Sequence, residues 1–141
     1  MYARLMIEYI YNLAEMETKD IYGFFVGWRN PPNNETFLKI LKNSYRVVCA
    51  VEGDKLIGFT NAISDAVLSA YIPLLEFLPE YQGGGIGKRL VKLMLESLSD
   101  LYVIDLLCDQ SLLTFYEKLG MKPSTGVLIR NYDNQNGVLN S

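Results

Sequence analysis

The segment that most restricts how this chain can fold is a run of three glycines directly before an amphipathic stretch. Residues 79–89 read Pro-Glu-Tyr-Gln-Gly-Gly-Gly-Ile-Gly-Lys-Arg. The apolar residues that follow recur at helical spacing, and the charged residues fall largely on the opposite side. These apolar residues are Ile86, Leu90, Leu93, Met94 and Leu98. We therefore expect a helix over 86–98 that begins at a glycine loop and buries one face.

This loop has two interpretations. Glycines let the backbone approach a ligand closely, and the N–H groups at a helix start carry partial positive charge, so the loop can hold a phosphate. The alternative is a flexible glycine turn without a ligand. Two known phosphate loops do not fit the sequence. The P-loop pattern needs glycine at Gln82 and a hydroxyl at Arg89, and the dinucleotide pattern started at Gly83 needs glycine at Lys88.

The rest of the chain is expected to contain short strands and helices. Strands are predicted at Tyr2–Asn12, Tyr45–Glu52, Lys55–Ser64, Val67–Leu78, Leu101–Cys108 and Lys122–Tyr132. Helices are predicted at Thr18–Trp28, which two glycines weaken, from an Asn34 cap through Leu41, at 86–98 and at Gln110–Leu119. The tail from Asp133 is polar and is expected to fray.

Some of these strands have a predicted place in the sheet. Tyr2–Asn12 should be an edge strand, and the almost continuous apolar stretch Leu101–Cys108 should be central. Gly53-Asp54 is a short turn that should join an antiparallel hairpin. Pro73 should create an edge, a bulge or a loss of pairing, because proline has no N–H for the ladder. We expect the sheet to open there.

Size and charge narrow the class of protein. A chain of 141 residues, half of them hydrophobic, should form one domain over 1–141. It carries 13 Lys+Arg against 16 Asp+Glu, a formal charge of −3, without a basic run, so we expect no nucleic-acid partner. Apolar runs fall short of a membrane span, and charges interrupt the amino-terminal residues, so we expect neither a membrane partner nor a signal peptide. The expected location is cytoplasmic.

Residue types that are rare or absent limit the chemistry. Histidine does not occur, which excludes His-based triads, His general bases and zinc sites with His ligands. Cys49 and Cys108 stand far apart in apolar stretches, and we expect buried free thiols rather than a metal or redox site. We expect no metal. Proton transfer must use Asp, Glu, Tyr, Lys, Cys or water.

Two motifs connect the chain to a known family. The run Gln82-Gly83-Gly84-Gly85-Ile86-Gly87 matches the Q/R-x-x-G-x-G/A signature of the GNAT acetyltransferase superfamily. The run Phe115-Tyr116-Glu117-Lys118-Leu119-Gly120-Met121 resembles its F/L-Y-E-K-L-G-F segment. The resemblance covers nearly the whole chain. It implies an α/β (α+β) fold with a mixed, mostly antiparallel sheet, splayed between strands 4 and 5 and flanked by about four helices. It also implies acetyl-CoA as co-substrate and an amine acceptor.

The resemblance further implies which residues bind the co-substrate. The backbone of Glu76, Phe77 and Leu78 would pair with the pantetheine arm. N–H groups of the loop would hold the pyrophosphate, so the expected binding residues are Phe77, Leu78, Gln82, Gly83, Gly84, Gly85, Ile86, Gly87 and Lys88. Many members carry Asn seven positions before the motif tyrosine. Here Asp109 stands at that position, and we expect it to make no such contact, because an anion repels a polyanionic ligand.

The catalytic residues are expectations of the same kind. Tyr116 would protonate the departing thiolate, and the N–H of Phe77 or Leu78 would stabilise the oxyanion. Glu76 is the first candidate for the base, Asp105 the second, and a water chain the third. The alternatives are a packed aromatic for Tyr116 and, for Glu76, a solvated carboxylate or one that attracts a cationic acceptor.

An aromatic, glycine-rich stretch is the candidate acceptor wall. Tyr22, Phe25 and Trp28 would bind an amine with an apolar body, together with Asp105, although such aromatics are more often core. The competing function is a non-catalytic acyl-CoA-binding sensor or subunit. A homodimer is also open.

Overall fold

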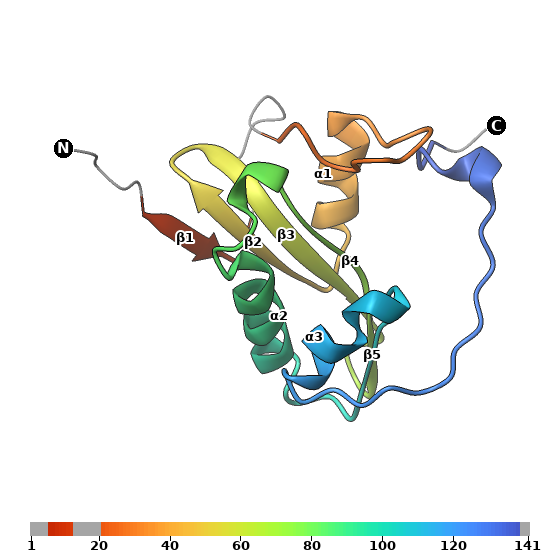
Figure 1. Ribbon diagram of the computed structural model, residues 1–141. Helices are drawn as coiled ribbons and strands as arrows, with labels where there is room; N and C mark the ends of the chain where they lie inside the picture. The colour runs from red at the N-terminus through yellow and green to blue at the C-terminus, as the bar shows by residue number, and fades with distance from the viewer. Residues whose placement is uncertain (1–5, 13–20, 139–141) are drawn as a thin grey trace.

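The protein is described by a computed structural model that covers residues 6–12 and 21–138. Tyr2–Leu5 of the predicted first strand and Thr18–Asp20 of the predicted first helix lie outside these residues. Within the described residues, five strands form one sheet in the order β1-β2-β3-β4-β5. They are β1 (Ile7–Ile10), β2 (Arg46–Glu52), β3 (Lys55–Ser64), β4 (Ser69–Phe77) and β5 (Val103–Asp105). The first three pairings are antiparallel and the last is parallel (Figure 1). The sheet is therefore mixed and mostly antiparallel, as expected.

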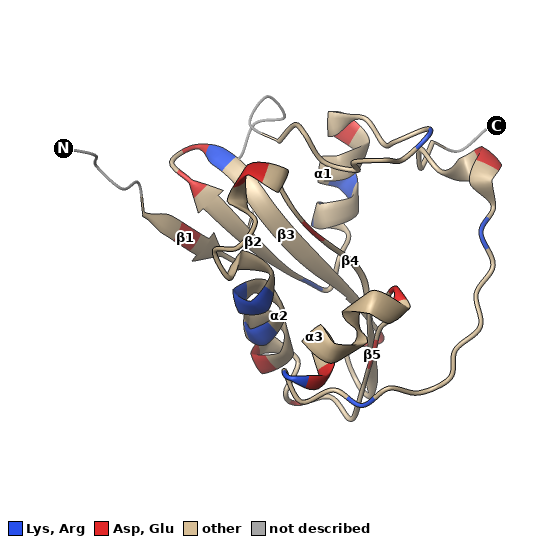
Figure 2. Ribbon diagram, viewed as in Figure 1, with Lys and Arg blue, Asp and Glu red and all other residues tan. Residues whose placement is uncertain are grey.

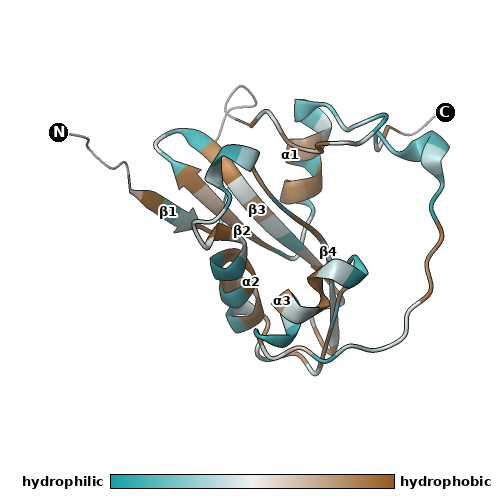
Figure 3. Ribbon diagram, in the orientation of Figure 1, coloured by the Kyte–Doolittle hydropathy of each residue, from teal (hydrophilic) through white to brown (hydrophobic). Residues whose placement is uncertain are grey.

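The helices cover both faces of this sheet. They are α1 (Asn34–Lys42), α2 (Ile86–Ser97) and α3 (Leu113–Glu117), with α2 and α3 in front of the sheet and α1 behind it in Figure 1. Figure 2 shows Lys and Arg on the outer side of α2, and Figure 3 shows the apolar colour along the strands. We expected about four helices. The described residues form three α-helices, because residues 21–33 are bends and turns.

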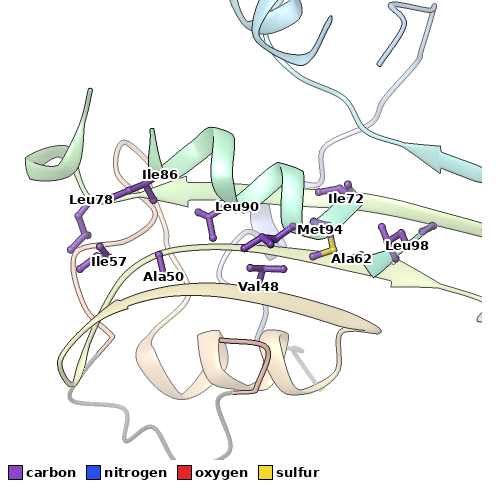
Figure 4. Close-up of a cluster of buried hydrophobic side chains, with 12 residues drawn as sticks. Val48, Ala50, Ile57, Ala62, Ile72, Leu78, Ile86, Leu90, Met94 and Leu98 are labelled. Atoms are coloured by element: carbon purple, nitrogen blue, oxygen red, sulfur yellow. The ribbon is translucent and has the colours of Figure 1, made fainter. Parts of the chain in front are cut away.

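Two apolar layers hold the domain together. On one face, Leu90 and Met94 of α2 and its C-cap Leu98 pack against Val48 and Ile72 (Figure 4). On the other face, α1 and the loop before it pack against Cys49 and its neighbours on β2 and β3. Both faces of β2 and of most of β3 are thus buried, which explains the unbroken apolar run over 47–51 in β2. β3 buries Thr60 and Asn61 as well as apolar residues.

Local sequence accounts for the turns and the helix start. Gly53 adopts φ 60 in the two-residue turn between β2 and β3, where Glu52 pairs with Lys55. The cap of α1 is Asn33 rather than the predicted Asn34. Its side chain accepts a hydrogen bond from the N–H of Thr36 at 2.8 Å, whereas Asn34 already has helical geometry.

Pro73 acts as predicted. The β3–β4 register shifts between Asn61 and Ile63, which pair with Leu74 and Tyr71, so β4 carries one extra residue there. This is a β-bulge, and it contains the residue that has no N–H to donate. The parallel ladder between β4 and β5 also covers only Ser69–Tyr71. From Ile72 to Phe77, β4 continues beyond the last β5 partner, and the sheet opens where expected.

Two predicted strands are wrong in extent or place. Leu101–Cys108 contributes only Val103–Asp105, at the end of the strand order rather than in its centre. Lys122–Tyr132 forms no strand, because none of the strands in the described part of the chain pairs with it, and residues 122–131 are all exposed. The predicted helix Gln110–Leu119 is shorter: a 3₁₀ turn over Gln110–Leu112 leads into α3.

The polar tail is attached to the domain within the described residues. The Gln135 side chain accepts a hydrogen bond from the N–H of Asn30 at 2.8 Å, so the tail does not fray there as predicted. Cys49 is a buried free thiol, as expected, but Cys108 is only half-buried. Within residues 6–12 and 21–138, the helices are too short or too polar to cross a bilayer.

Candidate active site

The glycine loop has the backbone geometry of a ligand loop. A 3₁₀ turn, Pro79–Tyr81, follows β4, and Gly85 is the N-cap of α2 in the left-handed conformation. Gly83 and Gly85 have φ 82 and 78, values that other residues adopt only with strain. A Cβ atom built on either would meet nothing within 4 Å. Glycine is therefore required by backbone conformation, and the surface above the loop is open.

The electrostatics of the loop favour an anion. The first intrahelical bond of α2 runs from the N–H of Arg89 to the carbonyl of Gly85 at 3.0 Å, so the N–H groups of Ile86, Gly87 and Lys88 precede it without a helical acceptor. The first turn contains no acidic residue, and the Lys88 and Arg89 side chains are exposed. Free donors, the positive end of the helix and two cations together fit a phosphate group.

Phe77 locks this helix start to the end of β4. A Cβ atom on Gly87 would lie 3.0 Å from the Phe77 ring, and one on Gly58 of β3 would lie 3.0 Å from the Phe77 Cβ. Both glycines leave room for the ring, which brings the loop and the open strand together. Sequence reasoning did not single out Gly58. The available signal was a glycine between the apolar residues Ile57 and Phe59 of a predicted strand, since such a glycine marks close approach of another group.

The backbone of β4 presents alternate residues to the opening. The N–H of Leu78 donates to the carbonyl of Ile57 on β3 at 2.8 Å, so it is already used within the sheet. Successive residues of a strand direct their N–H groups to opposite sides. The N–H of Phe77 therefore points away from β3, toward the open side. Of the two candidate oxyanion donors, Phe77 is the one that this geometry favours.

Tyr116 lies in the opening itself. It is 8% exposed and lines a cleft of about 290 Å³ between β4 residues 72–75 and the segment that follows β5. Burial, with a smaller contribution from the charge of Cys108, raises the pKa of Tyr116 to about 12. A phenol is protonated at neutral pH at its ordinary pKa, and burial extends the protonated state of Tyr116 to higher pH, as suits a proton donor. Cys108 lines the same cleft, and the sequence did not predict it as a site residue. Its position only eight residues before Tyr116 was the available signal. Asp109 is also on the wall of this cleft.

Glu76 is part of a clamp between β4 and the loop before α1. Its two carboxylate oxygens accept hydrogen bonds from the N–H groups of Phe25 at 2.8 Å and Val26 at 3.2 Å. Phe25 has φ 61, a strained value for a residue with a side chain. The carboxylate thus stabilises a turn 50 residues away in sequence, a contact that no local pattern indicates.

The residues predicted for the acceptor wall separate into two groups. Phe25 is 5% exposed and belongs to the core, where its ring packs against Phe37 at 5.0 Å and Trp28 at 4.9 Å between centroids. Tyr22 and Trp28 are 59% and 37% exposed. These two remain the candidates for contact with an acceptor.

Asp105 lies on the other side of the opening. It is exposed at the end of β5 and lines a cavity of about 400 Å³ together with Tyr71, Tyr116 and Gly126. The structure therefore places Asp105 and Tyr116 around one cavity.

The open mixed sheet and the glycine loop that follows its fourth strand form the arrangement expected of a GNAT-like fold. Residues 7–121 match the sequence model of the acetyltransferase (GNAT) family. Because this match covers most of the 141 residues, the chain belongs to the GNAT family.

Individual relatives agree with this assignment. The crystal structure of a protein from Deinococcus radiodurans R1 that is assigned as an acetyltransferase superimposes on this chain with a TM-score of 0.91. The two sequences are 40% identical, and the match covers 95% of this chain and 94% of that one. An uncharacterized N-acetyltransferase, ycf52, of Pyropia yezoensis is 31% identical over 72% of this chain and 62% of its own length. The chloroplastic GCN5-related N-acetyltransferase 2 of Arabidopsis thaliana is 33% identical over 77% of this chain and 51% of its own length. The chain thus spans about half to two thirds of these two relatives.

Proposed function

We propose that this protein transfers an acetyl group from acetyl-CoA to an amine by direct attack in a ternary complex. The observation that carries the proposal is the position of the open glycine loop beside the place where β4 separates from β5, with Tyr116 in the resulting cleft. A phosphate-holding loop alone would serve many ligands. A loop joined to an open strand backbone and a buried phenol is suited to a long, flexible thioester.

The proposed binding site uses main-chain groups for most contacts. N–H groups from Gly83 to Lys88 hold the pyrophosphate, and the exposed side chains of Lys88 and Arg89 add positive charge. The open backbone side of β4, which includes Phe77, pairs with the pantetheine arm. Acetyl-CoA supplies the acetyl group as a reactive thioester.

The proposed chemistry assigns one role to each polar group near the opening. The Phe77 N–H donates to the carbonyl oxygen as it gains negative charge. Tyr116 donates its phenolic proton to the departing sulfur, and a phenol carries this proton at neutral pH. The two backbone contacts of Glu76 favour a positioning role for this residue over that of a base. Asp105, or a water chain, then accepts the proton of the amine.

The exposed aromatic side chains point to a class of acceptor. The exposed faces of Tyr22 and Trp28 suit an amine with an apolar body, because aromatic faces attract cations. We propose a primary amine of a small molecule or peptide, and a cytoplasmic location.

A loop variant with a matched control tests binding. Gly85→Asp adds an anion where the pyrophosphate would lie, and it also adds the strain of a side chain at positive φ, which is smaller for Asp than for most other residues. The control is Gly53→Asp in the β2–β3 turn, which has φ 60 and also nothing within 4 Å of a Cβ. Calorimetry should show acetyl-CoA affinity reduced about tenfold or more, about 1.4 kcal/mol, for Gly85→Asp only. Equal affinity of the two variants would contradict the loop assignment.

Turnover needs a separate test. Thiol release from acetyl-CoA should be measured with a panel of primary amines and compared with release in water. Amine-dependent release supports transfer, whereas thermal stabilisation by acetyl-CoA without release by any amine would favour the acyl-CoA-binding sensor.

A further inference from the structure

The chain has two cysteines, and the fold places them in different environments. Cys49 is 0% exposed in the core between the sheet and α1, and burial raises the pKa of its thiol to about 12. Cys108 is half-buried and follows β5 by three residues. It lines both the cleft of about 290 Å³ beside β4 and the cavity of about 400 Å³ at β5. Since a thiol reacts only where a reagent reaches it, Cys108 is the reactive cysteine of the two.

The cleft that Cys108 lines also contains a hydroxyl group without a protein partner. Tyr116 is 8% exposed and lines the cleft and the cavity together with Cys108. Within residues 6–12 and 21–138, its hydroxyl forms no hydrogen bond. A buried polar group that lacks a partner is costly, so this hydroxyl fits a ligand atom that enters the cleft.

The Cys108 thiol and the Tyr116 hydroxyl are neighbours. The charge of Cys108 contributes to the raised pKa of Tyr116, an electrostatic effect that weakens with distance. A ligand atom that meets the Tyr116 hydroxyl therefore comes close to the Cys108 sulfur. In the proposed function this atom is the sulfur of CoA, because Tyr116 donates its proton to the departing thiolate.

We propose that Cys108 is a modification site at which CoA disulfide leaves one CoA bound to the protein through a mixed disulfide. This inference rests on the proposed function, because the glycine loop and β4 have to hold the CoA. The thiolate of Cys108 attacks one sulfur of CoA disulfide, and the bond between the two CoA sulfurs breaks as the new bond forms. The second CoA leaves as a thiolate and takes up the proton that Cys108 released. One disulfide replaces another, so no further oxidant is needed.

The adduct inactivates the enzyme reversibly. Its CoA occupies the place of acetyl-CoA, and its sulfur carries no acetyl group. A disulfide bond is about 2.05 Å long, so the CoA sulfur moves from Tyr116 to Cys108, which the freely rotating end of the pantetheine arm permits. Excess thiol reverses the exchange and frees the site. Acetyl transfer thus follows the ratio of CoA to CoA disulfide around the protein.

Intact-mass measurement after treatment with CoA disulfide tests the proposal. The test variant is Cys108→Ser, and the control is Cys49→Ala, which removes the buried thiol instead. Wild type and Cys49→Ala should gain one CoA per chain and lose it in dithiothreitol, whereas Cys108→Ser should gain none. Peptide mapping of the wild type should place the CoA on Cys108, a result that does not depend on the folding of any variant.

Two further treatments distinguish a CoA site from a thiol that any disulfide modifies. Glutathione disulfide at the same concentration should react at least about tenfold more slowly, because it lacks the pyrophosphate that the loop holds, and tenfold corresponds to about 1.4 kcal/mol of binding. Acetyl-CoA at about ten times its Kd should slow the reaction with CoA disulfide about tenfold, since it occupies the same site.

Several results would overturn the proposal. They are a wild type that gains no CoA, a CoA that maps to Cys49, glutathione disulfide that reacts as fast as CoA disulfide, and an absence of protection by acetyl-CoA. Calorimetry with acetyl-CoA on the same wild-type sample distinguishes this failure from that of the proposed function. Binding of acetyl-CoA without an adduct overturns this inference alone, whereas an absence of binding overturns the proposed function with it.

Discussion

The substitution Glu76→Gln separates two roles for the one acidic residue of β4. In the structure both carboxylate oxygens accept backbone hydrogen bonds, from Phe25 at 2.8 Å and Val26 at 3.2 Å. Glutamine keeps one acceptor oxygen and replaces the other by an amide that donates, so one bond is lost and two donors face each other. The substitution also removes the negative charge, so it would disable Glu76 if this residue were the general base.

The expected cost follows from these contacts. A hydrogen bond to a charged group contributes about 1.5–3 kcal/mol, and the exposed Val26 contact belongs at the lower end. The clamp also supports the positive φ of Phe25, which by itself costs about 1–3 kcal/mol. We expect Glu76→Gln to lose about 1–3 kcal/mol of unfolding free energy, with a Tm lower by about 3–12 °C.

Kinetics should show a positioning defect. The KM for the amine should rise because the loop that carries Trp28 loses its anchor, while acetyl-CoA affinity stays unchanged. The kcat should fall by less than about tenfold, since removal of a true general base costs about 10²–10⁴-fold. Glu96→Gln, on the exposed side of α2, is the charge-matched control. An unchanged Tm with a kcat loss above about a hundredfold, and loss of the acidic limb of the pH–rate profile, would refute the clamp and establish Glu76 as the base.

Three other substitutions test the site and the core. Tyr116→Phe should leave stability and acetyl-CoA affinity nearly unchanged but lower single-turnover kcat by about 10²–10⁴-fold, and near-normal chemistry would leave Tyr116 as a packing residue. Trp28→Ala should raise the KM for the amine without changing acetyl-CoA binding, whereas a pure loss of stability would make Trp28 core only. Burial raises the pKa of the Cys49 thiol to about 12, so above its ordinary value of 9.0 the unfolded chain binds fewer protons and stability falls with pH. The unfolding free energy should fall by about 1.4 kcal/mol per pH unit above pH 9 in the wild type. In Cys49→Ala, chemical unfolding should show this fall beginning nearer pH 10, where Tyr116 starts to contribute.

The sequence by itself determined the features that depend on neighbours along the chain. Spacing of apolar residues predicted α2, and the glycines before it predicted a ligand loop, because helix periodicity and positive φ are local properties. Gly53-Asp54 predicted the hairpin, and Pro73 predicted the bulge and the opening of the sheet, since a missing N–H has the same effect in any ladder. The two motifs then led to the family.

Only the tertiary structure decided which groups meet across long distances in sequence. Glu76 was recognisable as the acidic residue of its strand, but its binding of the Phe25 and Val26 N–H groups depends on how the loop crosses β4. The place of Gly58 under Phe77 likewise needs three elements together. The strand predicted at Lys122–Tyr132 shows the physical reason for this division. Strand propensity resides in the residues, whereas a strand exists only when a second backbone supplies the other half of its hydrogen bonds.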